Sequence, residues 1–504
     1  MGLDRRRFLK TAGIGALSLY VHGCLKSPKK SEDLSGEKPN ILLICVDDLR
    51  PELGCYDKSY MKTPHLDRLA NKGCVFSRHY IQAPTCGPSR YSLLTGLRPC
   101  HADQLSNTYM ENNFHKQPET ETPETFVHHF RRNGYTTVGI GKISHTPDGR
   151  VRGEGQHWEL PHSWDEMLCD TGKWGGGFDA FFAYASGESR ASMNHQVPPL
   201  ESADVPDEGY PDGLNANLAV RKLREISTKN QPFLLSVGFF KPHLPFNSPK
   251  KYWDLYDRED VSLSPNPVVP ESTPPFLLHS SREFFGNYRK GKEYGGLGDI
   301  ISDDYAREIR HAYFAAVSYV DSQIGKVLNA LEDLGLEKNT VIVVWGDHGW
   351  HLGDHTIWGK HSPFERSAHS PLIIKFPDMK QPGTKTDALV ETVDIYPTLC
   401  DLAGVEPPQD LDGQSLEAIL NNPETPGKPA AYSYQRNRIS MRTERYRLIV
   451  HVEEGISTVA LYDHQVDPNE TKNIAEERPD IVQRLMPLLK KGNTGIIPDF
   501  GTGL

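Results

Sequence analysis

Two uninterrupted apolar runs, at residues 40–46 and 340–345, predict buried strands. A strand that is apolar on both faces is typical of a parallel sheet covered by helices on both sides. Before the second run, residues 302–334 repeat apolar side chains three or four positions apart, which predicts an amphipathic helix that stops at Gly335. Helices that alternate with strands in this way predict an α/β fold with a doubly wound, mostly parallel sheet.

The pattern changes near residue 426, where long helices and buried runs give way to short alternating strands. The further elements that we expect are a strand at 371–376, a helix at 390–404, short strands around Tyr432, at 447–450 and at 458–462, and a last helix at 479–490. We therefore expect an export signal and linker at 1–35, a catalytic α/β domain at 36–425, and a smaller C-terminal α+β subdomain at 426–504 with an antiparallel sheet and a helix.

The beginning of the chain is typical of an export signal. The basic stretch MGLDRRRFLK precedes an apolar stretch of about 11 residues at 11–21. The arginines at 5–7 resemble a twin-arginine motif, and Cys24 resembles the acylated cysteine of a bacterial lipoprotein. A plain cleaved signal and a fortuitous basic terminus are the alternatives. Either export route would place the mature protein in the periplasm or at the cell surface.

Composition and charge exclude several classes of protein. The net charge is −10 over 504 residues, so no basic surface for non-specific nucleic-acid binding is expected, although a local basic pocket is not excluded. No apolar run reaches the length of about 18 residues that suggests a membrane span. The 8 cysteines are too few and too unevenly spaced for a disulfide scaffold. The 43 glycines and 38 prolines indicate a folded chain that is rich in loops.

Polar side chains follow both buried runs directly. Asp47 and Asp48 come after the first run, and Asp347 and His348 come after the second. In doubly wound sheets the ligand crevice lies beyond the carboxyl ends of the strands, so we expect these residues to meet there. Asp47 and Asp48 alone would suggest a solvated loop or a helix cap. The second cluster favours a site for a hard cation, because carboxylate oxygens suit such an ion.

The most informative stretch is APTCGPSRYSLLTG at residues 83–96. Its fixed positions are Cys86, Pro88, Ser89, Arg90, Thr95 and Gly96. This pattern resembles the signature of the type I sulfatases, in which the cysteine is oxidised after translation to formylglycine. The resemblance implies the alkaline-phosphatase-like sulfatase fold and the hydrolysis of sulfate esters. It also implies a maturation partner, either a formylglycine-generating enzyme or an anaerobic sulfatase-maturating enzyme.

The resemblance also implies why an aldehyde is useful at this position. A hydrated aldehyde offers two hydroxyl groups on one carbon. One hydroxyl attacks sulfur, and deprotonation of the other expels sulfate by breaking the bond between carbon and oxygen. One difficult step is thereby divided into two easier ones, which is the general logic of covalent catalysis.

The other site residues of the family find counterparts in chain order. Asp47, Asp48, Cys86, Asp347 and His348 match the ligands of one divalent metal ion, usually Ca²⁺. By the same resemblance, this cation would neutralise sulfate charge and orient the formylglycine hydroxyl.

A set of cationic and protonatable groups completes the resemblance. Lys142 and His145 match residues that contact sulfate and the formylglycine hydroxyl, and Arg90 lies beside the nucleophile. The resemblance makes His145 the base for the second step, and makes His243 with Lys360 the groups that protonate or stabilise the leaving alcohol oxygen. Each lysine or histidine taken singly would more often be a surface or turn residue.

Longer matches point to one branch of the family. The segments at 46–51, 241–246, 318–323 and 347–350 resemble sulfatases that act on the 2-O-sulfate of a hexuronate. The resemblance extends from residue 38 to 404 and fails between 148 and 215. In that gap the candidate sugar contacts, with loop packing as the alternative, are Asp165, Asp170, Trp174 and the aromatic stretch 178–184.

Three functions follow from these observations. The first is an exported sulfatase that acts on a sulfated oligosaccharide or polysaccharide, from a glycosaminoglycan or an alga. The second is a phosphonate or phosphate ester hydrolase of the alkaline phosphatase superfamily. The third is a catalytically silent carbohydrate-binding homologue, which predicts a lost nucleophile or metal ligand, whereas Cys86, Arg90 and three aspartates are all present.

Overall fold

The computed structural model describes residues 38–153, 155–497 and 500. The predicted export signal, the twin-arginine motif and Cys24 lie outside these residues. The described residues form one compact unit. In the described part of the chain, no helix is long and apolar enough to cross a membrane.

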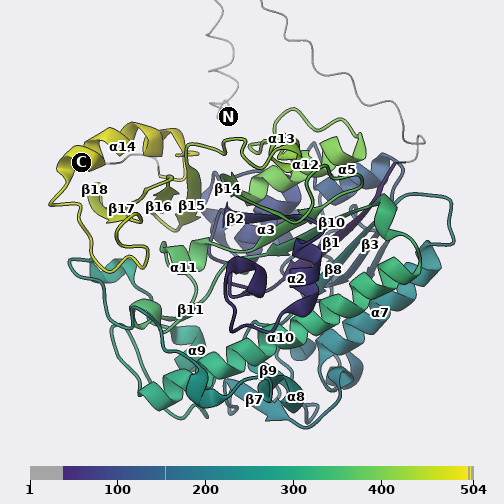
Figure 1. Cartoon of the computed structure of the whole chain (residues 1–504), viewed down its shortest axis with the longest axis horizontal. Coiled ribbons are helices and arrows are strands. Elements are labelled where there is room, and N and C mark those ends of the chain that lie inside the picture. The colour runs from purple at the N-terminus through teal and green to yellow at the C-terminus, as the bar shows by residue number, and fades with distance from the viewer. Residues whose placement is uncertain (1–37, 154, 498–499, 501–504) are drawn as a thin grey trace, which may run out of the picture. The chain divides into compact units, whose positions relative to one another are not determined.

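Eight strands form a central sheet in the order β14-β2-β13-β10-β1-β8-β3-β6 (Figure 1). Their bounds are β1 (Asn40–Val46), β2 (Cys74–Tyr80), β3 (Thr136–Gly141), β6 (Glu166–Leu168), β8 (Phe233–Phe239), β10 (Thr340–Gly346), β13 (Leu372–Lys375) and β14 (Thr384–Glu391). Strand β13 runs antiparallel to both of its neighbours, and every other pair in this sheet is parallel. The predicted mixed, mostly parallel sheet is confirmed.

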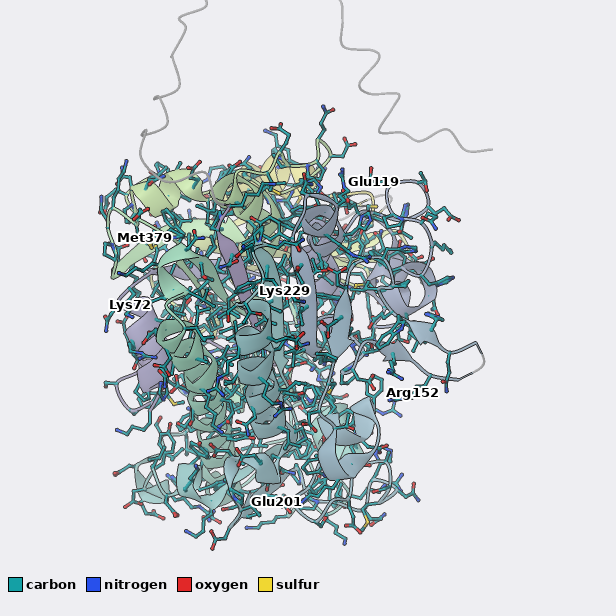
Figure 2. The ribbon with its side chains drawn as sticks, turned by 90° about the vertical axis from the view of Figure 1, so that its right-hand side faces the viewer. Lys72, Glu119, Arg152, Glu201, Lys229 and Met379 are labelled. Atoms are coloured by element: carbon teal, nitrogen blue, oxygen red, sulfur yellow. The ribbon has the colours of Figure 1, made fainter. Side chains whose placement is uncertain are left out.

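Helices cover both faces of the central sheet. On one face lie α2 (Pro64–Ala70), α7 (Pro211–Ile226) and α10 (Asp303–Asp333), and on the other lie α3 (Cys86–Thr95), α5 (Phe126–Arg132) and α12 (Ile395–Ala403). The shorter helices in this part of the chain are α4 (Tyr109–Asn113), α6 (Gly177–Phe181), α8 (Lys250–Trp253), α9 (Arg282–Asn287), α11 (Glu365–Ala368) and α13 (Glu417–Asn421). Figure 2 shows α7, which ends just before the labelled Lys229, beside α10.

Successive side chains of β1 enter two different hydrophobic clusters, because a strand points alternate residues to opposite faces. Leu42 and Ile44 belong to the cluster that includes α2, α7 and α10, whereas Ile41 and Leu43 belong to the cluster that includes α3, α5 and α12. All four side chains are fully buried. The uninterrupted apolar run therefore reflects a strand buried on both faces.

Most predicted element boundaries agree with the structure to within about two residues. The predicted helix at 302–334 is α10, and the Ser302 hydroxyl caps its start by accepting a hydrogen bond from the backbone N–H of Tyr305. Gly335 follows its last turn with a φ of +71°, a conformation that favours glycine. The predicted helix at 390–404 begins too early, because Val390 and Glu391 pair with β2 as the end of β14.

A separate antiparallel sheet lies toward the C-terminus. Its strands, in spatial order, are β15 (Ala431–Gln435), β16 (Arg438–Arg442), β17 (Tyr446–Glu453) and β18 (Ile456–Asp463). Helix α14 (Pro479–Lys491) shares a hydrophobic cluster with this sheet. The sheet also contacts the larger α/β part of the chain, since the N–H of Tyr434 donates to the carbonyl of Gln82 at 2.7 Å. The domain boundary at residue 425 stays a prediction.

Three short two-stranded sheets complete the fold. They pair β4 (Arg150–Val151) with β5 (His157–Trp158), β7 (Leu200–Ala203) with β9 (Phe246–Pro249), and β11 (His351–Leu352) with β12 (Trp358–Gly359).

A buried ion-pair network joins the C-terminal sheet to the rest of the chain. Arg447 on β17 pairs with Glu470 at 2.5 Å and also with Glu365 on α11. Burial alone would raise the pKa of Glu470, but the Arg447 charge and a hydrogen bond from His464 lower it from the ordinary 4.5 to about 2. The stabilisation from this carboxylate is therefore complete above the ordinary value and is lost as the pH falls toward about 2.

We expect Glu470→Gln to reduce the loss of stability of the protein in acid. The measurement is the urea midpoint between pH 6 and pH 3, where the wild type should lose stability more steeply than the variant. The variant should be less stable at neutral pH, since Arg447 loses a buried partner. Equal slopes in the two proteins would show that Glu470 does not titrate in this way.

Candidate active site

The carboxyl ends of β2, β10, β1, β8 and β3 lie at one edge of the central sheet, because these strands all run in the same direction. Val46 and Gly346 are paired across β1 and β10, so Asp47 and Asp347 are the next residues beyond the two strand ends. The N–H of Asp48 donates to Asp347 Oδ1 at 2.9 Å. The two predicted acidic clusters are thus brought together.

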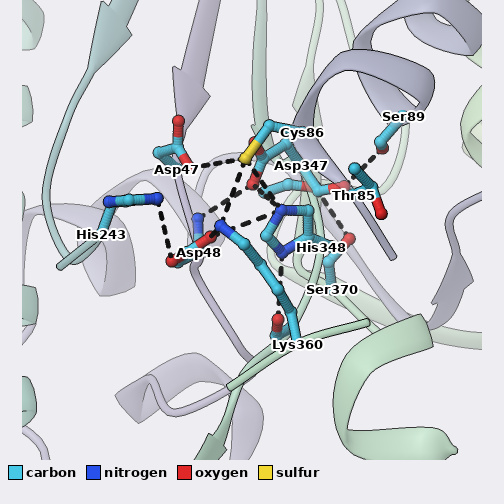
Figure 3. A network of polar contacts seen from close by, with 12 residues as sticks. Asp47, Asp48, Thr85, Cys86, Ser89, His243, Asp347, His348, Lys360 and Ser370 are labelled. Atoms are coloured by element: carbon cyan, nitrogen blue, oxygen red, sulfur yellow. Dashed lines mark hydrogen bonds and ion pairs between the residues drawn. The ribbon is translucent and has the colours of Figure 1, made fainter. Parts of the chain in front are cut away.

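Cys86 is the first residue of α3, which follows the carboxyl end of β2. Figure 3 shows its sulfur among residues from three other segments of the chain. Cys86 Sγ lies 3.4 Å from Asp47 Oδ1, 3.3 Å from His348 Nε2 and 3.3 Å from Lys360 Nζ. Burial and the Asp47 carboxylate raise the pKa of Cys86 to about 12, so the protein's own groups keep this thiol neutral at pH 7.

Arg90 lies one helical turn after Cys86 on α3 and is completely buried. Its guanidinium contacts Asp47 Oδ2 at 3.2 Å and Asp347 Oδ2 at 3.0 Å, and it also donates to the carbonyl of Ile143 at 3.1 Å. One side chain therefore fixes both carboxylates relative to the helix that carries Cys86. The planar guanidinium suits this role because it presents several donors in a rigid arrangement.

The acidic residues and nearby side chains form two overlapping sets of candidate metal ligands. In each set one ligand atom per residue lies within 4.8 Å of the others, and the sets are Asp47, Asp48, Cys86 and His243, and Asp47, Cys86, Asp347 and His348. His348 Nδ1 donates to the carbonyl of Gly349 at 3.0 Å, so Nε2 is the ring nitrogen directed at the cluster.

One buried oxygen in this cluster lacks a hydrogen-bond partner among the described residues. It is Asp48 Oδ2, while Asp48 Oδ1 lies 2.7 Å from Lys360 Nζ and 3.3 Å from His348 Nε2. Burial raises the pKa of Asp48 well above its ordinary range, although the Lys360 and His348 charges oppose this effect. A hard cation would satisfy such an oxygen, so this donor set fits a metal of that class.

Lys142 and Lys360 approach the cluster from the ends of two different strands, β3 and β12. Lys142 follows β3, and its Nζ lies 2.5 Å from Asp47 Oδ2 and 4.0 Å from the centre of the Phe181 ring. Gly141, with a φ of +73°, turns the chain at this point, and a Cβ there would lie 2.2 Å from the carbonyl oxygen of Gly238. The close packing of two strand ends thus requires glycine before Lys142.

The two predicted histidines occupy different positions around Cys86. His145 lines the same cavity as Cys86, and its buried Nδ1 has no hydrogen-bond partner among the described residues. Burial and the Lys142 charge lower the pKa of His145 to about 3, which keeps the ring neutral. His243 Nε2 lies 3.7 Å from Asp48 Oδ2, and burial with the Lys360 charge holds its pKa well below the ordinary range.

The end of β8 is held by a residue that the sequence did not indicate. Asp212 on α7 accepts hydrogen bonds from the N–H groups of Phe240 and Lys241, each at 2.8 Å. Lys241 Nζ in turn donates to the carbonyl of His243 at 3.0 Å. These contacts orient the loop that presents His243. Lys241 lies in the segment 241–246 that resembles the family. Its contacts depend on a reversal of chain direction that no local pattern predicts.

A cavity of about 410 Å³ opens over Cys86. All the predicted cationic and protonatable groups except Arg90 line it, and Arg90 is buried beneath. The sequence did not indicate Glu283, whose carboxylate lies 3.6 Å from His243 Nε2 and 3.9 Å from Lys360 Nζ. Arg190, which lies 3.9 Å from Glu283, was not indicated either. Neither residue lies in a recognisable motif, so no signal in the sequence marked them.

In the segment 148–215, where the family resemblance fails, only some of the candidate sugar contacts line the cavity. Phe178, Phe181 and Phe182 line the cavity, and Arg190 from the same segment stacks on Phe182. The other candidates do not line it: Asp165 pairs with Arg131, Asp170 faces Arg221, and Trp174 is buried in a hydrophobic cluster.

Comparison with known proteins agrees with this site. The sequence model described as Sulfatase matches residues 39–405, and the model described as N-sulphoglucosamine sulphohydrolase, C-terminal, matches residues 353–492. The chain therefore belongs to the sulfatase family. It is accordingly a hydrolase that acts on sulfate esters.

One relative and two solved structures are similar to this chain over most of its length. Iduronate 2-sulfatase of Mus musculus is 35% identical over 445 residues, which cover 80% of this chain and 77% of that protein. A solved structure in complex with its substrate D-glucosamine-2-N,6-O-disulfate has a TM-score of 0.69 at 22% identity and covers 91% of this chain and 98% of that chain. For the phosphonate monoester hydrolase of Agrobacterium radiobacter the TM-score is 0.71 at 24% identity, with 91% and 95% covered. The structural likenesses show the fold alone, and the predicted alkaline-phosphatase-like sulfatase fold is confirmed.

Proposed function

We propose that this sulfatase removes the sulfate group from a sulfated saccharide, and that its preferred group is the 2-O-sulfate of a uronate in a glycosaminoglycan or an algal polysaccharide. The observation that carries the proposal is the position of Cys86, at a cavity of about 410 Å³ between buried carboxylates and the ammonium groups of Lys142 and Lys360. The likeness to iduronate 2-sulfatase supports the uronate.

The proposed nucleophile is formylglycine made from Cys86 by a maturation enzyme. When present, this residue supplies a hydrated aldehyde whose hydroxyl group is the nucleophile toward sulfur. Lys142 and Lys360 stabilise the anionic sulfate group by charge. His145, neutral and without a partner at Nδ1, accepts the proton that leaves the hydroxyl at residue 86 in the second step.

The leaving alcohol oxygen needs a proton or a positive charge. Lys360 Nζ lies 3.3 Å from Cys86 Sγ, and His243 lines the same cavity. We assign this role to the pair, as the family resemblance implies. Arg90 acts as a positioning residue, since it contacts Asp47 and Asp347 and is itself fully buried.

We further propose that Asp47, Asp48, residue 86, Asp347 and His348 hold one Ca²⁺ ion. Carboxylate oxygens dominate this set and match the preference of calcium, and Asp48 Oδ2 is buried without a hydrogen-bond partner among the described residues. When bound, the ion supplies positive charge that neutralises sulfate and lowers the cost of charge development.

We expect added Ca²⁺ to raise the thermal unfolding temperature of the protein. At 100 times its Kd, a ligand that binds only the folded state stabilises it by about 2.7 kcal/mol. Asp48→Asn should lose most of this shift. Glu119→Gln is the matched control, since Glu119 belongs to a more exposed acidic cluster with Glu124 and His128. An equal calcium shift in Asp48→Asn and the wild type would contradict the assignment.

One remaining proposal concerns the beginning of the chain. We propose that residues 1–35 direct export to the periplasm or cell surface, with Cys24 as the site of a lipid anchor. The basic stretch followed by an apolar stretch supports this proposal.

We also propose that the chain divides near residue 425 into a catalytic domain and a C-terminal subdomain. The separate hydrophobic cluster of β15, β16, β17 and α14 supports that division.

The function is tested by a screen of defined saccharides that each carry one sulfate at a known ring position. We expect the highest kcat/KM for a saccharide that carries a 2-O-sulfated uronate. A matched phosphonate or phosphate ester should react at least about 100-fold more slowly, which corresponds to about 2.7 kcal/mol in transition-state stabilisation. A preference for the phosphonate would establish the alternative ester hydrolase. Saccharide binding without release of sulfate by matured protein would indicate the silent homologue.

A further inference from the structure

A second cavity, of about 760 Å³, adjoins the cavity over Cys86. The two cavities share Asn107 and His361 in their walls. The second one extends from α9 and the segment before it to the hairpin formed by β15 and β16. It therefore lies between the catalytic part of the chain and the C-terminal sheet.

His361 connects the second cavity to the nucleophile. Its Nδ1 contacts the hydroxyl of Thr85, the residue before Cys86, at 2.8 Å. Its backbone carbonyl accepts a hydrogen bond from the side chain of Gln435 at the end of β15. The hairpin is therefore held in a fixed position relative to Cys86, which a binding site shared by both parts requires.

The charged side chains in the walls of the second cavity are mostly cationic. They are Arg282, Arg436, Arg438 and the carboxylate of Glu453, because burial lowers the pKa values of the three histidines in the walls and favours their neutral form. The Glu453 side chain is 71% exposed and lies 3.4 Å from His451. Such a concentration of positive charge contrasts with the net charge of −10 for the whole chain.

The three arginines have no ion-pair partner in the part of the chain that the structure describes. Arg282 and Arg436 are exposed, whereas Arg438 is 9% exposed and contacts the neutral groups His451 and Gln435. Burial and the nearby Arg436 charge lower the pKa of Arg438 to about 10, although the Glu453 carboxylate opposes this effect. Unpaired guanidinium groups in a hollow suit the planar, bidentate recognition of carboxylate or sulfate.

We propose that this basic groove, defined by Arg282, Arg436 and Arg438, binds a second anionic group on a neighbouring sugar of the substrate, so that the enzyme prefers a polyanionic oligosaccharide over a singly charged saccharide. The inference rests on the proposed function in that the sulfate to be removed occupies the first cavity. Sulfate and carboxylate share the recognising chemistry, so either group fits the groove.

The test measures affinity for a heparin-derived tetrasaccharide by calorimetry, in the full chain carrying Cys86→Ala so that the ligand is not consumed. Arg282→Ala combined with Arg436→Ala should weaken binding by about 10-fold at low salt, since two exposed charge contacts are lost. Arg484→Ala on α14 is the control, because this arginine is also exposed but lies outside the groove. It should leave the affinity unchanged.

Two further measurements make the outcome decisive. Salt of about 0.5 M should remove most of the difference between the two affinities, because it screens exposed charges. A tetrasaccharide that keeps its carboxylates but lacks the additional sulfates shows which anion the groove recognises. Equal affinities with and without the two arginines, or no measurable binding, would overturn the groove. Failure of the matured wild type to release sulfate from the tetrasaccharide would instead contradict the proposed function, and the affinities would still decide on the groove.

Discussion

Replacing Cys86 with alanine is expected to lower kcat/KM for sulfate release by at least about 10⁴-fold, because the residue that becomes the nucleophile is lost. The fold should persist, since only a sulfur atom at the cavity is removed. Circular dichroism and the unfolding temperature check the fold, and sulfate release checks the activity. Cys86→Ser should lose activity to the same extent in a host whose maturation enzyme converts only cysteine.

Mass spectrometry of the peptide that contains Cys86 completes this test. In wild-type protein from a host with the maturation enzyme, the peptide should contain formylglycine, and the active fraction should follow the converted fraction. An unmodified cysteine in fully active enzyme would exclude formylglycine as the nucleophile. The buried, neutral thiol makes that outcome unexpected, since the thiolate is the reactive form of cysteine.

Replacing Arg90 with alanine is expected to destabilise the protein by about 3–5 kcal/mol and to abolish activity. The change leaves Asp47 and Asp347 as buried carboxylates without their shared partner, and removing one member of a buried ion pair has a cost of this size. The urea midpoint measures the loss. Arg90→Lys should recover only part of it, because an ammonium group cannot reproduce the bidentate contacts.

The matched control for Arg90 is Arg445→Ala. Arg445 also pairs with a carboxylate, Asp463, through two contacts, but its side chain is 46% exposed. Solvent screens such a pair, so its loss should have a much smaller effect on the urea midpoint. If both variants were destabilised equally, the buried position of Arg90 would not be the reason for its importance.

The proposed nucleophile, Cys86, and the acidic cluster around it illustrate how much of the site a local sequence pattern predicts. Cys86 and Arg90 fall in one short signature, and the apolar run before Asp47 identifies a buried strand without any knowledge of its neighbours. The rule that parallel strands present their carboxyl ends at one edge then predicts that Asp47 and Asp347 meet. Their backbone and side-chain contacts agree with that prediction.

Glu283 and β13 illustrate what local pattern does not contain. The apolar pattern at 371–376 predicts a strand, but not its direction. That β13 runs antiparallel depends on how the chain returns to the sheet to place this strand between β10 and β2. Glu283 reaches His243 and Lys360 only because α9 packs beside the loops that carry them. The helix predicted at 390–404 begins later in the structure, because pairing of Val390 and Glu391 with β2 outweighs the local preference for a helix.

The sequence by itself determined the class of fold, the proposed nucleophile and the charged residues expected around it, because burial on both faces of a strand and a short family signature are both local properties. Only the tertiary structure decided which further side chains share the cavity and where a second basic groove lies. Arg282 and Arg436 are 154 positions apart in the chain and lie in one groove only because the C-terminal hairpin packs beside the catalytic part. Contacts of this kind arise from packing between distant segments, and no periodicity along the chain records them.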